Sequence, residues 1–430
     1  MDNKGLHGDG DLNYLTTTAS SKNLVFTPDT TFGVVDTLIN TLTASATMNV
    51  PAVQSAKTFV RLDPAANSLT ASTIDTPMRM YGGQAFFHGS TELTPKGMQG
   101  TGLADFTNAT LKSKLFDLKS MQVHADTSDF RLTEGETCSI AVRTDNVNTT
   151  IKLDERYGDF VSNGAETKVE FPVNQYVCFM DRFKWYMDQG DIALESDQKA
   201  AAGNADLNLS GSNFISVRPD QDSLRFMAPK ARYDLKRHLI TANNVQYIRV
   251  ADALITPDSM RVRIGKNAEM QPLTDATVTA NFVNKYHVIH DATVNIAARR
   301  QYSGNGLYDY VDETGKAFVI HMQNINVDTA YQTYARGRIS QDEGFQLSPA
   351  FDYFGDVILH ASTKELTFSG STRIQHACAG IARNWMNCTG LIDPKQVFIP
   401  VSDSLMDAKG LPIGAGIYLT KDDTFKTYGT

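Results

Sequence analysis

The chain has 430 residues, of which 41% are hydrophobic and 20% are charged, and this composition excludes a wholly disordered protein. Its 48 acidic and 40 basic residues give a formal net charge of −8, so no overall basic field exists to attract nucleic acid or an anionic membrane. No run of about 18 apolar residues occurs, which excludes a membrane-spanning helix.

The opening residues 1–14 lack the apolar stretch of a signal peptide, so any export would depend on sequence that is not present here. Repeated segments begin at Leu6, and we therefore expect the chain to be part of something longer. Four cysteines without a C-x-x-C spacing indicate neither a disulfide scaffold nor a zinc site.

Hydrophobic and polar residues alternate in short runs that Gly, Asn, Asp, Ser and Thr clusters separate, which predicts an all-β protein with little helix. In residues 83–90 the odd-numbered positions are small or apolar and the even-numbered ones more polar, so one side of this strand should face a core. Helical periodicity is strongest at Gln375–Met386 and around Arg182–Met187.

Three segments share the pattern apolar-x-G-x-G-x-x-x-aromatic. They are LHGDGDLNY from Leu6, MQGTGLADF from Met98 and YSGNGLYDY from Tyr302. We interpret them as strands in one common register, in which the glycines allow a bend or a close backbone approach rather than phosphate binding.

A longer internal match joins Tyr81–Thr94 to Tyr353–Thr367, which are identical at eight of fourteen positions once a one-residue gap admits Lys364. We predict that the two segments take equivalent places in their sheets, with apolar side chains buried in both.

Two shorter repeats are typical of corners. The pattern [Asp or Asn]-Ala-Thr begins at Asn108, Asp275 and Asp291, and Thr-Pro-Asp follows an apolar residue at Phe26 and Ile255. Degenerate strand repeats of this kind favour an elongated β-solenoid or a folded-over (taco-like) β-sheet repeat, in which each repeat is buried by its neighbours, with a Greek-key sandwich ranked second.

The sequence divides into four blocks, whose boundaries we place where the repeat patterns are no longer recognisable. They are a β-repeat block at 1–135, an aromatic-rich middle segment at 136–215 with a flexible insertion at 196–213, a second β-repeat block at 216–375, and a C-terminal element at 376–430.

No catalytic motif is present, and we expect no catalytic residue, no cofactor and no metal. His287, His290 and Asp291 could suggest zinc, but an i, i+3 pair on a strand points to opposite faces. Trp185 with its aromatic neighbours Tyr176, Phe183 and Tyr186 could form a platform for sugar rings, although a small core is the favoured interpretation.

The sequence contains three long runs of strand-like alternation, ARGRISQDEGFQLSP, YFGDVILHASTKELTFSG and APKARYDLKRHLITANNVQYI. These runs resemble the strand repeats of the OstA/LptA and AsmA/TamB class of envelope proteins. The ordered series PDTT, LTPKGMQGTG, FPVNQY, ATVNIAARRQYSGNGLYDY and IDPKQVFIPV is similar to very large uncharacterised proteins of Bacteroidota envelopes. The first resemblance implies a folded-over sheet with an apolar groove that conducts lipid, and the second implies a location in the periplasm or at the outer membrane.

We therefore expect a non-enzymatic segment of a larger cell-envelope protein that is structural or conducts lipid, with lipid or other envelope proteins as partners. The alternatives are an adhesin or glycan-binding module, which would need exposed aromatic residues, and a polysaccharide-degrading enzyme on a β-solenoid, which would need clustered carboxylates. In the lipid-conducting case, the candidate groove residues are Ala85, Phe87, Val278, Val294, Ile296, Val357 and Leu359.

Overall fold

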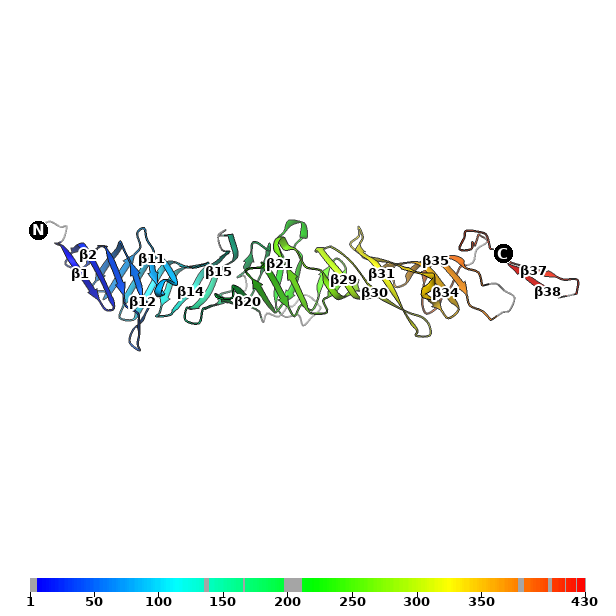
Figure 1. Cartoon of the computed structure of the whole chain (residues 1–430), viewed down its shortest axis with the longest axis horizontal. Helices are drawn as coiled ribbons and strands as arrows, with labels where there is room; N and C mark the ends of the chain where they lie inside the picture. Colours follow the sequence, from blue (N-terminus) through cyan, green and yellow to red (C-terminus); the bar gives the residue numbers. More distant parts are fainter. Residues whose placement is uncertain are drawn as a thin grey trace. The chain divides into compact units, whose positions relative to one another are not determined.

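The computed structural model describes residues 6–134, 139–164, 167–196, 211–377, 383–400, 404–413, 415–422 and 424–429. Over these residues the chain forms 38 β-strands and four short 3₁₀ turns, with no α-helix (Figure 1). About 34 of the strands belong to one antiparallel sheet. The all-β prediction is confirmed, and antiparallel pairing fits the folded-over sheet rather than the parallel stacking of a solenoid.

Two compact units can be separated by their internal contacts. Unit 1 comprises residues 1–218, 227–244 and 263–269, and unit 2 comprises residues 219–226, 245–262 and 270–430. The strands β22 (Arg225–Ala228) and β27 (Arg261–Ile264) include residues of both units.

The described elements of unit 1 are as follows: β1 (Leu6–Tyr14), β2 (Thr17–Phe26), β3 (Thr31–Val35), β4 (Thr37–Asn40), β5 (Thr43–Ala44), β6 (Asn49–Val50), β7 (Val53–Ser55), β8 (Thr58–Asp63), β9 (Ser68–Ser72), β10 (Met78–Met80), η1 (Tyr81–Gly83), β11 (Ala85–Thr94), β12 (Gly97–Phe106), β13 (Ala109–Leu118), β14 (Gln122–Glu134), β15 (Ser139–Lys152), β16 (Tyr157–Ser162), β17 (Val169–Phe171), β18 (Tyr176–Cys178), β19 (Arg182–Tyr186), β20 (Asp191–Glu195), β21 (Ser212–Ser216), β23 (Lys230–Asp234), β24 (Leu239–Asn243) and η3 (Lys266–Ala268).

The described elements of unit 2 are η2 (Pro219–Gln221), β25 (Ile248–Val250), β26 (Ala253–Thr256), β28 (Leu273–Ala280), β29 (His287–Ala298), β30 (Gln301–Val311), β31 (Ala317–Val327), β32 (Thr333–Ile339), η4 (Gln341–Glu343), β33 (Gln346–Ser348), β34 (Phe351–His360), β35 (Leu366–Ile374), β36 (Met386–Ile392), β37 (Ala415–Leu419) and β38 (Phe425–Gly429).

Within unit 1 the sheet divides and rejoins. Strand β2 pairs with β3 through one end and with β4 through the other. From there one series of strands runs β3, β8, β9 and a second runs β4, β7, β10. Both series end on β11, which pairs with β10 through residues 85–87 and with β9 through residues 90–93. A long strand therefore ties two series of short strands together.

The sheet divides again after β15, which pairs with both β16 and β17. One series continues β16, β19, β20, β23, β24 and the other continues β17, β18, β21. The rings of Phe171 on β17 and Tyr233 on β23 lie 5.1 Å apart between centroids, so the two series face each other across a shared interior. This is the arrangement of a sheet folded over its own apolar face.

The three G-x-G segments form equivalent strands, as the sequence predicts. Each of β1, β12 and β30 has the same irregularity in its pairing with the next strand, located between Gly8 and Gly10, between Gly100 and Gly102, and between Gly304 and Gly306. In each case the next strand carries one extra residue there, which is a β-bulge. The common register of the three segments is confirmed.

The bulge also positions a serine that the sequence analysis missed. Ser21 Oγ donates to the carbonyl of Val34 at 2.8 Å and accepts from the amide of Asn23 at 3.1 Å. Ser113 Oγ makes the same two bonds, to the carbonyl of Thr127 at 2.7 Å and from the amide of Leu115 at 3.1 Å. The shared Ser-Lys dipeptide after two G-x-G segments, at residues 21–22 and 113–114, is the signal that could have revealed it.

Unit 2 continues as a chain of neighbouring antiparallel strands from β28 to β32, then to β34, β35 and β36. Two of the predicted corner sequences fall within its bent strands: Asp275 and Asp291 have φ values of 53° and 48° and lie at irregularities of β28 and β29. Aspartate tolerates this left-handed conformation better than most residues, which explains its place at the bends.

The match between Tyr81–Thr94 and Tyr353–Thr367 does not produce equivalent elements, and that prediction is wrong. The first copy contains the continuous strand β11, whereas the second ends β34 at His360 and begins β35 at Leu366. Gly89, with φ of 146°, carries β11 through its bend, but its counterpart is Ala361, and the extra Lys364 allows a turn.

The helix expected at Arg182–Met187 is also wrong, because Arg182–Tyr186 is strand β19. Its burial alternates, with Phe183 and Trp185 buried and their neighbours more exposed, so the aromatic residues pack as strand residues. Residues 378–382 of the helix expected at Gln375–Met386 lie outside the described residues, and Met386 begins β36. Most of the insertion expected at 196–213 also lies outside them.

Candidate functional site

The seven side chains predicted to line a groove are all buried, and the structure divides them between the two units. Unit 1 contains Ala85 and Phe87 on β11, while the other five lie on β28, β29 and β34 of unit 2. Six of the seven are at most 2% exposed, and Ile296 is 6% exposed. The burial expected for Ala85, Phe87, Val357 and Leu359 is therefore confirmed.

Phe87 shows what covers such a side chain. Its ring meets that of Phe116 edge to face with centroids 5.8 Å apart. It also lies over Gly100 so closely that a Cβ on this glycine would be 3.0 Å from the ring. The chain's own atoms occupy the space beside Phe87.

An aromatic cluster fills the interior of unit 1 further along the chain. The ring of Phe160 lies 4.4 Å from the rings of both Phe130 and Phe183, measured between centroids, and is stacked on Phe183 with an interplanar angle of 5°. Phe130 also lies 5.6 Å from Trp185. Trp185 and Tyr176 are no more than 1% exposed, so these residues form a core, as favoured from the sequence, and offer no open platform for a sugar ring.

Unit 2 has a comparable aromatic interior. Tyr353 and Phe368 meet edge to face at 5.0 Å, and Tyr310 lies 5.2 Å from Phe345. The hydroxyl of Tyr310 donates to the carbonyl of Leu347 at 2.8 Å, which satisfies the one polar atom of that ring.

The structure places His287 and His290 on opposite faces of β29. His287 is fully buried, with Nε2 located 2.7 Å from the carbonyl of Thr363 and Nδ1 located 3.2 Å from the hydroxyl of Tyr308. His290 is partly exposed and lies 2.9 Å from a carboxylate oxygen of Asp291 and 3.3 Å from one of Asp309. The two imidazoles thus have separate partners.

These surroundings shift the pKa values of the two histidines in opposite directions. Burial lowers the pKa of His287, and its hydrogen bond to Thr363 and the charge of Glu365 offset only part of this. The hydrogen bond from His290 to Asp291, with support from Asp309, raises the pKa of His290 despite some burial.

A buried polar cluster that sequence reasoning missed lies in unit 1. Nε2 of His238, which is 1% exposed, is 2.6 Å from a carboxylate oxygen of Glu134, and its Nδ1 is 3.2 Å from the hydroxyl of Tyr233. The side-chain amide of Asn174 donates to the carbonyls of His238 at 2.6 Å and Gly265 at 2.8 Å. The hydrogen bond from His238 lowers the pKa of Glu134. Because hydrogen-bonded partners in this cluster lie as far as 104 positions apart in the sequence, no local sequence pattern could reveal it.

A surface depression of about 880 Å³ lies on β12, β13 and β14, where the pairing of β13 with β14 is interrupted between Lys112 and Asp117. Its charged and titratable lining residues are Lys112, Lys114, Asp117, His124, Asp126 and Asp129. Charges of both signs are present there, so the depression does not present the uniform field that a phosphate or a divalent cation would need.

A smaller depression of about 410 Å³ lies where β15 passes from β16 to β17. Its lining includes Arg143, Lys168 and Glu170, and both cations pair with this carboxylate, at 2.5 Å and 2.6 Å. Partial burial pushes the pKa of Glu170 upward, but the two hydrogen-bonded cations outweigh it and the pKa is lowered. The charged groups of Arg143, Lys168 and Glu170 in this depression are thus already paired with one another.

Comparisons with protein-family models, with curated proteins and with solved structures gave no match. Within the described ranges, no helix has the length and apolar character needed to cross a membrane.

Proposed function

We propose that this chain is a non-enzymatic, structural β-repeat segment of a larger cell-envelope protein, and that its own side chains, rather than lipid, fill its interior. The envelope location draws its support from the sequence resemblance, whereas the structural role draws its support from the packing of the two interiors.

The observation that carries the proposal is the burial of the seven candidate groove residues, none of which is more than 6% exposed. A groove wide enough for an acyl chain would leave its lining open to water when no lipid is present. Protein interiors instead reach crystal-like packing densities by interdigitating side chains. The stacked rings of Phe160 and Phe183, 4.4 Å apart, occupy space that a conduit would have to keep free.

The outward-facing charges also support a structural role. Arg182 pairs with Asp159 across β19 and β16, and Arg232 pairs with Asp191 across β23 and β20. In each case the two charged residues lie on adjacent strands, where opposite charges stabilise the sheet. Side chains paired in this way serve to hold neighbouring strands in register.

The test is to purify the protein without detergent, extract it with organic solvent and identify any lipid by mass spectrometry. A parallel sample is passed over a lipid-binding resin under native conditions, and its melting temperature is compared with that of the untreated protein. We expect less than about one lipid per ten chains and the same melting temperature in both samples, because removal of a ligand bound to the folded state would lower it.

Near-stoichiometric acyl lipid, with a melting temperature that falls after its removal, would contradict the proposal and favour a conduit. Phe160→Leu, which opens space in the interior, and Val161→Leu, at a neighbouring position that is 42% exposed, provide a matched pair. If lipid occupies the interior, the first variant changes the amount of bound lipid and the second does not.

A further inference from the structure

The sequence contains two Asn-Gly pairs, Asn163–Gly164 and Asn305–Gly306. In such a pair the backbone nitrogen of the glycine can attack the side-chain amide carbon of the asparagine, because glycine has no Cβ to hinder the approach. The attack requires the backbone between the two residues to rotate out of the extended strand conformation. Both pairs therefore carry the same chemistry, and the structure decides which of them is able to react.

Asn305 and Gly306 lie inside strand β30, which has a neighbouring strand on each side. Asn305 faces Thr293 on β29, and Gly306 faces Met322 on β31. A Cβ on Gly306 would lie 2.7 Å from Cγ2 of Ile289, so side-chain atoms also enclose this glycine closely. The peptide between Asn305 and Gly306 is unable to rotate unless β30 separates from its neighbours.

Asn163 and Gly164 are exposed and lie just beyond Ser162, the last residue of β16. The amide of Gly164 donates to the hydroxyl of Ser162 at 3.2 Å, which is a hydrogen bond within the same turn. A Cβ on Gly164 would meet nothing within 4 Å, so the space around this glycine is free. The attacking nitrogen is thus able to change its orientation without the separation of two paired strands.

The side chain of Asn163 joins three adjacent strands. Its Nδ2 donates to the carbonyl of Asp126 on β14 at 2.8 Å and lies 3.4 Å from Oδ1 of Asn146 on β15. The pairing of β14 with β15 is irregular at this point, between Ala125 and Ser128. Asn163 therefore reaches from the end of β16 across β15 to a bulge of β14, beside the place where β15 passes from β16 to β17.

We propose that Asn163–Gly164 is a site of spontaneous deamidation, and that the reaction weakens the connection between β14, β15 and β16. The nitrogen of Gly164 forms a bond to Cγ of Asn163, the bond from Cγ to Nδ2 breaks, and the proton of the attacking nitrogen leaves with Nδ2 as ammonia. Water then opens the resulting succinimide ring at one of its two carbonyls, which gives aspartate or isoaspartate. Water is the only co-reactant, and nothing is oxidised or reduced.

The product lacks the hydrogen-bond donor of Asn163 and carries a negative charge. An ionised carboxylate only accepts hydrogen bonds. The two groups that Nδ2 contacts, the carbonyl of Asp126 and Oδ1 of Asn146, are also acceptors. The new carboxylate would face oxygen atoms that offer it no proton, so we expect the bulge of β14 and the end of β16 to open more often. The proposal does not depend on whether the interior holds lipid.

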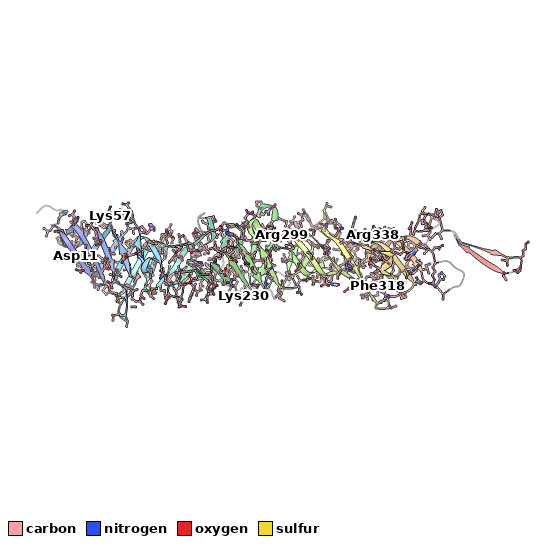
Figure 2. The ribbon with its side chains drawn as sticks, viewed as in Figure 1. Asp11, Lys57, Lys230, Arg299, Phe318 and Arg338 are labelled. Atoms are coloured by element: carbon pink, nitrogen blue, oxygen red, sulfur yellow. The ribbon has the colours of Figure 1, made fainter. Side chains whose placement is uncertain are left out.

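The test is to incubate the whole protein in mildly alkaline buffer, with and without urea, and to follow both pairs by mass spectrometry after digestion with trypsin. Asn163 lies in the tryptic peptide Tyr157–Lys168, and Asn305 lies in Gln301–Lys316, which begins just beyond Arg299 (labelled in Figure 2). In the folded protein Asn305 should react at least about tenfold more slowly than Asn163, because β30 must first open. In urea the two rates should be similar.

Gly164→Ala is the matched control. Gly164 lacks the left-handed backbone conformation that favours glycine and has free space at the Cβ position, so alanine fits there. The variant should keep the melting temperature of the wild-type protein but lose most of the reaction at Asn163, because the Cβ hinders ring closure. A reaction that Gly164→Ala does not slow, or that yields aspartate without isoaspartate, would overturn the attack by the Gly164 nitrogen.

The structural consequence is measured by hydrogen exchange on the intact and deamidated fractions, which ion exchange separates by their difference in charge. Amides of β14, β15 and β16 near Asp126 and Asn146 should exchange at least about threefold faster in the deamidated fraction, whereas those of β30 should be unchanged. Identical exchange in the two fractions would overturn the weakened connection. Equal rates of reaction at Asn163 and Asn305 in the folded protein would overturn the site itself.

Discussion

Gly89 and Gly102 face each other across β11 and β12, and a Cβ added to either one would lie 2.1 Å from a carbonyl oxygen of the opposite strand. Both have φ values of 146°, which side chains rarely adopt. The fold of unit 1 thus depends on two glycines in contact, and we expect Gly102→Ala to destabilise it by more than about 4 kcal/mol, the range reserved for severe steric conflicts. Chemical denaturation followed by circular dichroism measures this loss.

Gly10→Ala is the matched control, because Gly10 has the same backbone conformation but empty space at the Cβ position. It should cost only the backbone strain, about 1–3 kcal/mol. Equal losses for the two variants would show that the contact between β11 and β12 is not what requires glycine.

A second prediction concerns Leu359, which is fully buried on β34. Leu359→Ala should lower the free energy of unfolding by about 2–5 kcal/mol, because it removes apolar surface and leaves a cavity. Leu391→Ala, at a β36 position that is 57% exposed, should change it by less than about 0.5 kcal/mol. Unchanged midpoints for both variants in urea would contradict the assigned register of β34.

The third prediction is a loss of stability in mild acid through His287. Its pKa is lowered in the folded protein, so the unfolded chain binds a proton first as the pH falls. The stabilising effect is complete above the ordinary histidine pKa of about 6.5 and is lost as the pH falls below that value. Urea midpoints measured between about pH 8 and pH 5 should decrease, and His287→Gln should flatten this decrease.

His290 provides a control of opposite sign. Its pKa is raised by Asp291, so its contribution is fully present below the ordinary histidine pKa and is lost as the pH rises through the raised value. His290→Asn should therefore steepen the acid loss that His287 causes. If both variants flattened the pH dependence, the opposing environments assigned to the two faces of β29 would be wrong.

A fourth prediction addresses a buried hydrogen-bonded chain in unit 2. The hydroxyl of Tyr302 donates to Thr333 Oγ1 at 2.7 Å, and Thr333 Oγ1 donates to Asp252 at 2.6 Å. Thr333→Val keeps the shape but leaves the buried hydroxyl of Tyr302 without its acceptor and removes one of the two hydrogen bonds that Asp252 Oδ1 accepts from residue 333, which should cost about 1–3 kcal/mol.

Thr333→Ser should restore most of that loss in thermal melts, because serine keeps the hydroxyl. Tyr302→Phe removes the hydrogen bond between Tyr302 and Thr333 but leaves Thr333 bonded to Asp252, so it should cost less than Thr333→Val. A serine variant as unstable as the valine variant would assign the effect to packing rather than hydrogen bonding.

The sequence predicted those parts of the fold that local patterns determine. The alternation in residues 83–90 gave the correct buried face for Phe87, and the G-x-G segments gave three strands with one bulge. By contrast, the similarity of Tyr81–Thr94 to Tyr353–Thr367 was misleading, since one glycine and one inserted lysine decide whether the chain continues through a bend or turns back.

The division of the sheet into two series could not be predicted, because it depends on partners distant in sequence. Strand β15 pairs with β16 by a short turn, but β20 pairs with β23 across residues 196–229. Nothing in the composition of β20 selects β23 over a nearer strand. The contact of Asn174 with His238 is equally non-local, so this part of the candidate site could not be predicted either.

Strand β11 pairs with β9 and β10 on one side and with β12 on the other. Neither series of short strands can therefore open completely without disturbing β11, and β11 cannot leave without exposing both. Its amide protons should exchange with deuterated water in a single concerted opening, far more slowly than those of β3 or β4. The long strands that pair with both series should therefore limit local unfolding. When one short strand unfolds, the unfolding should remain confined to the short strands between two such long strands.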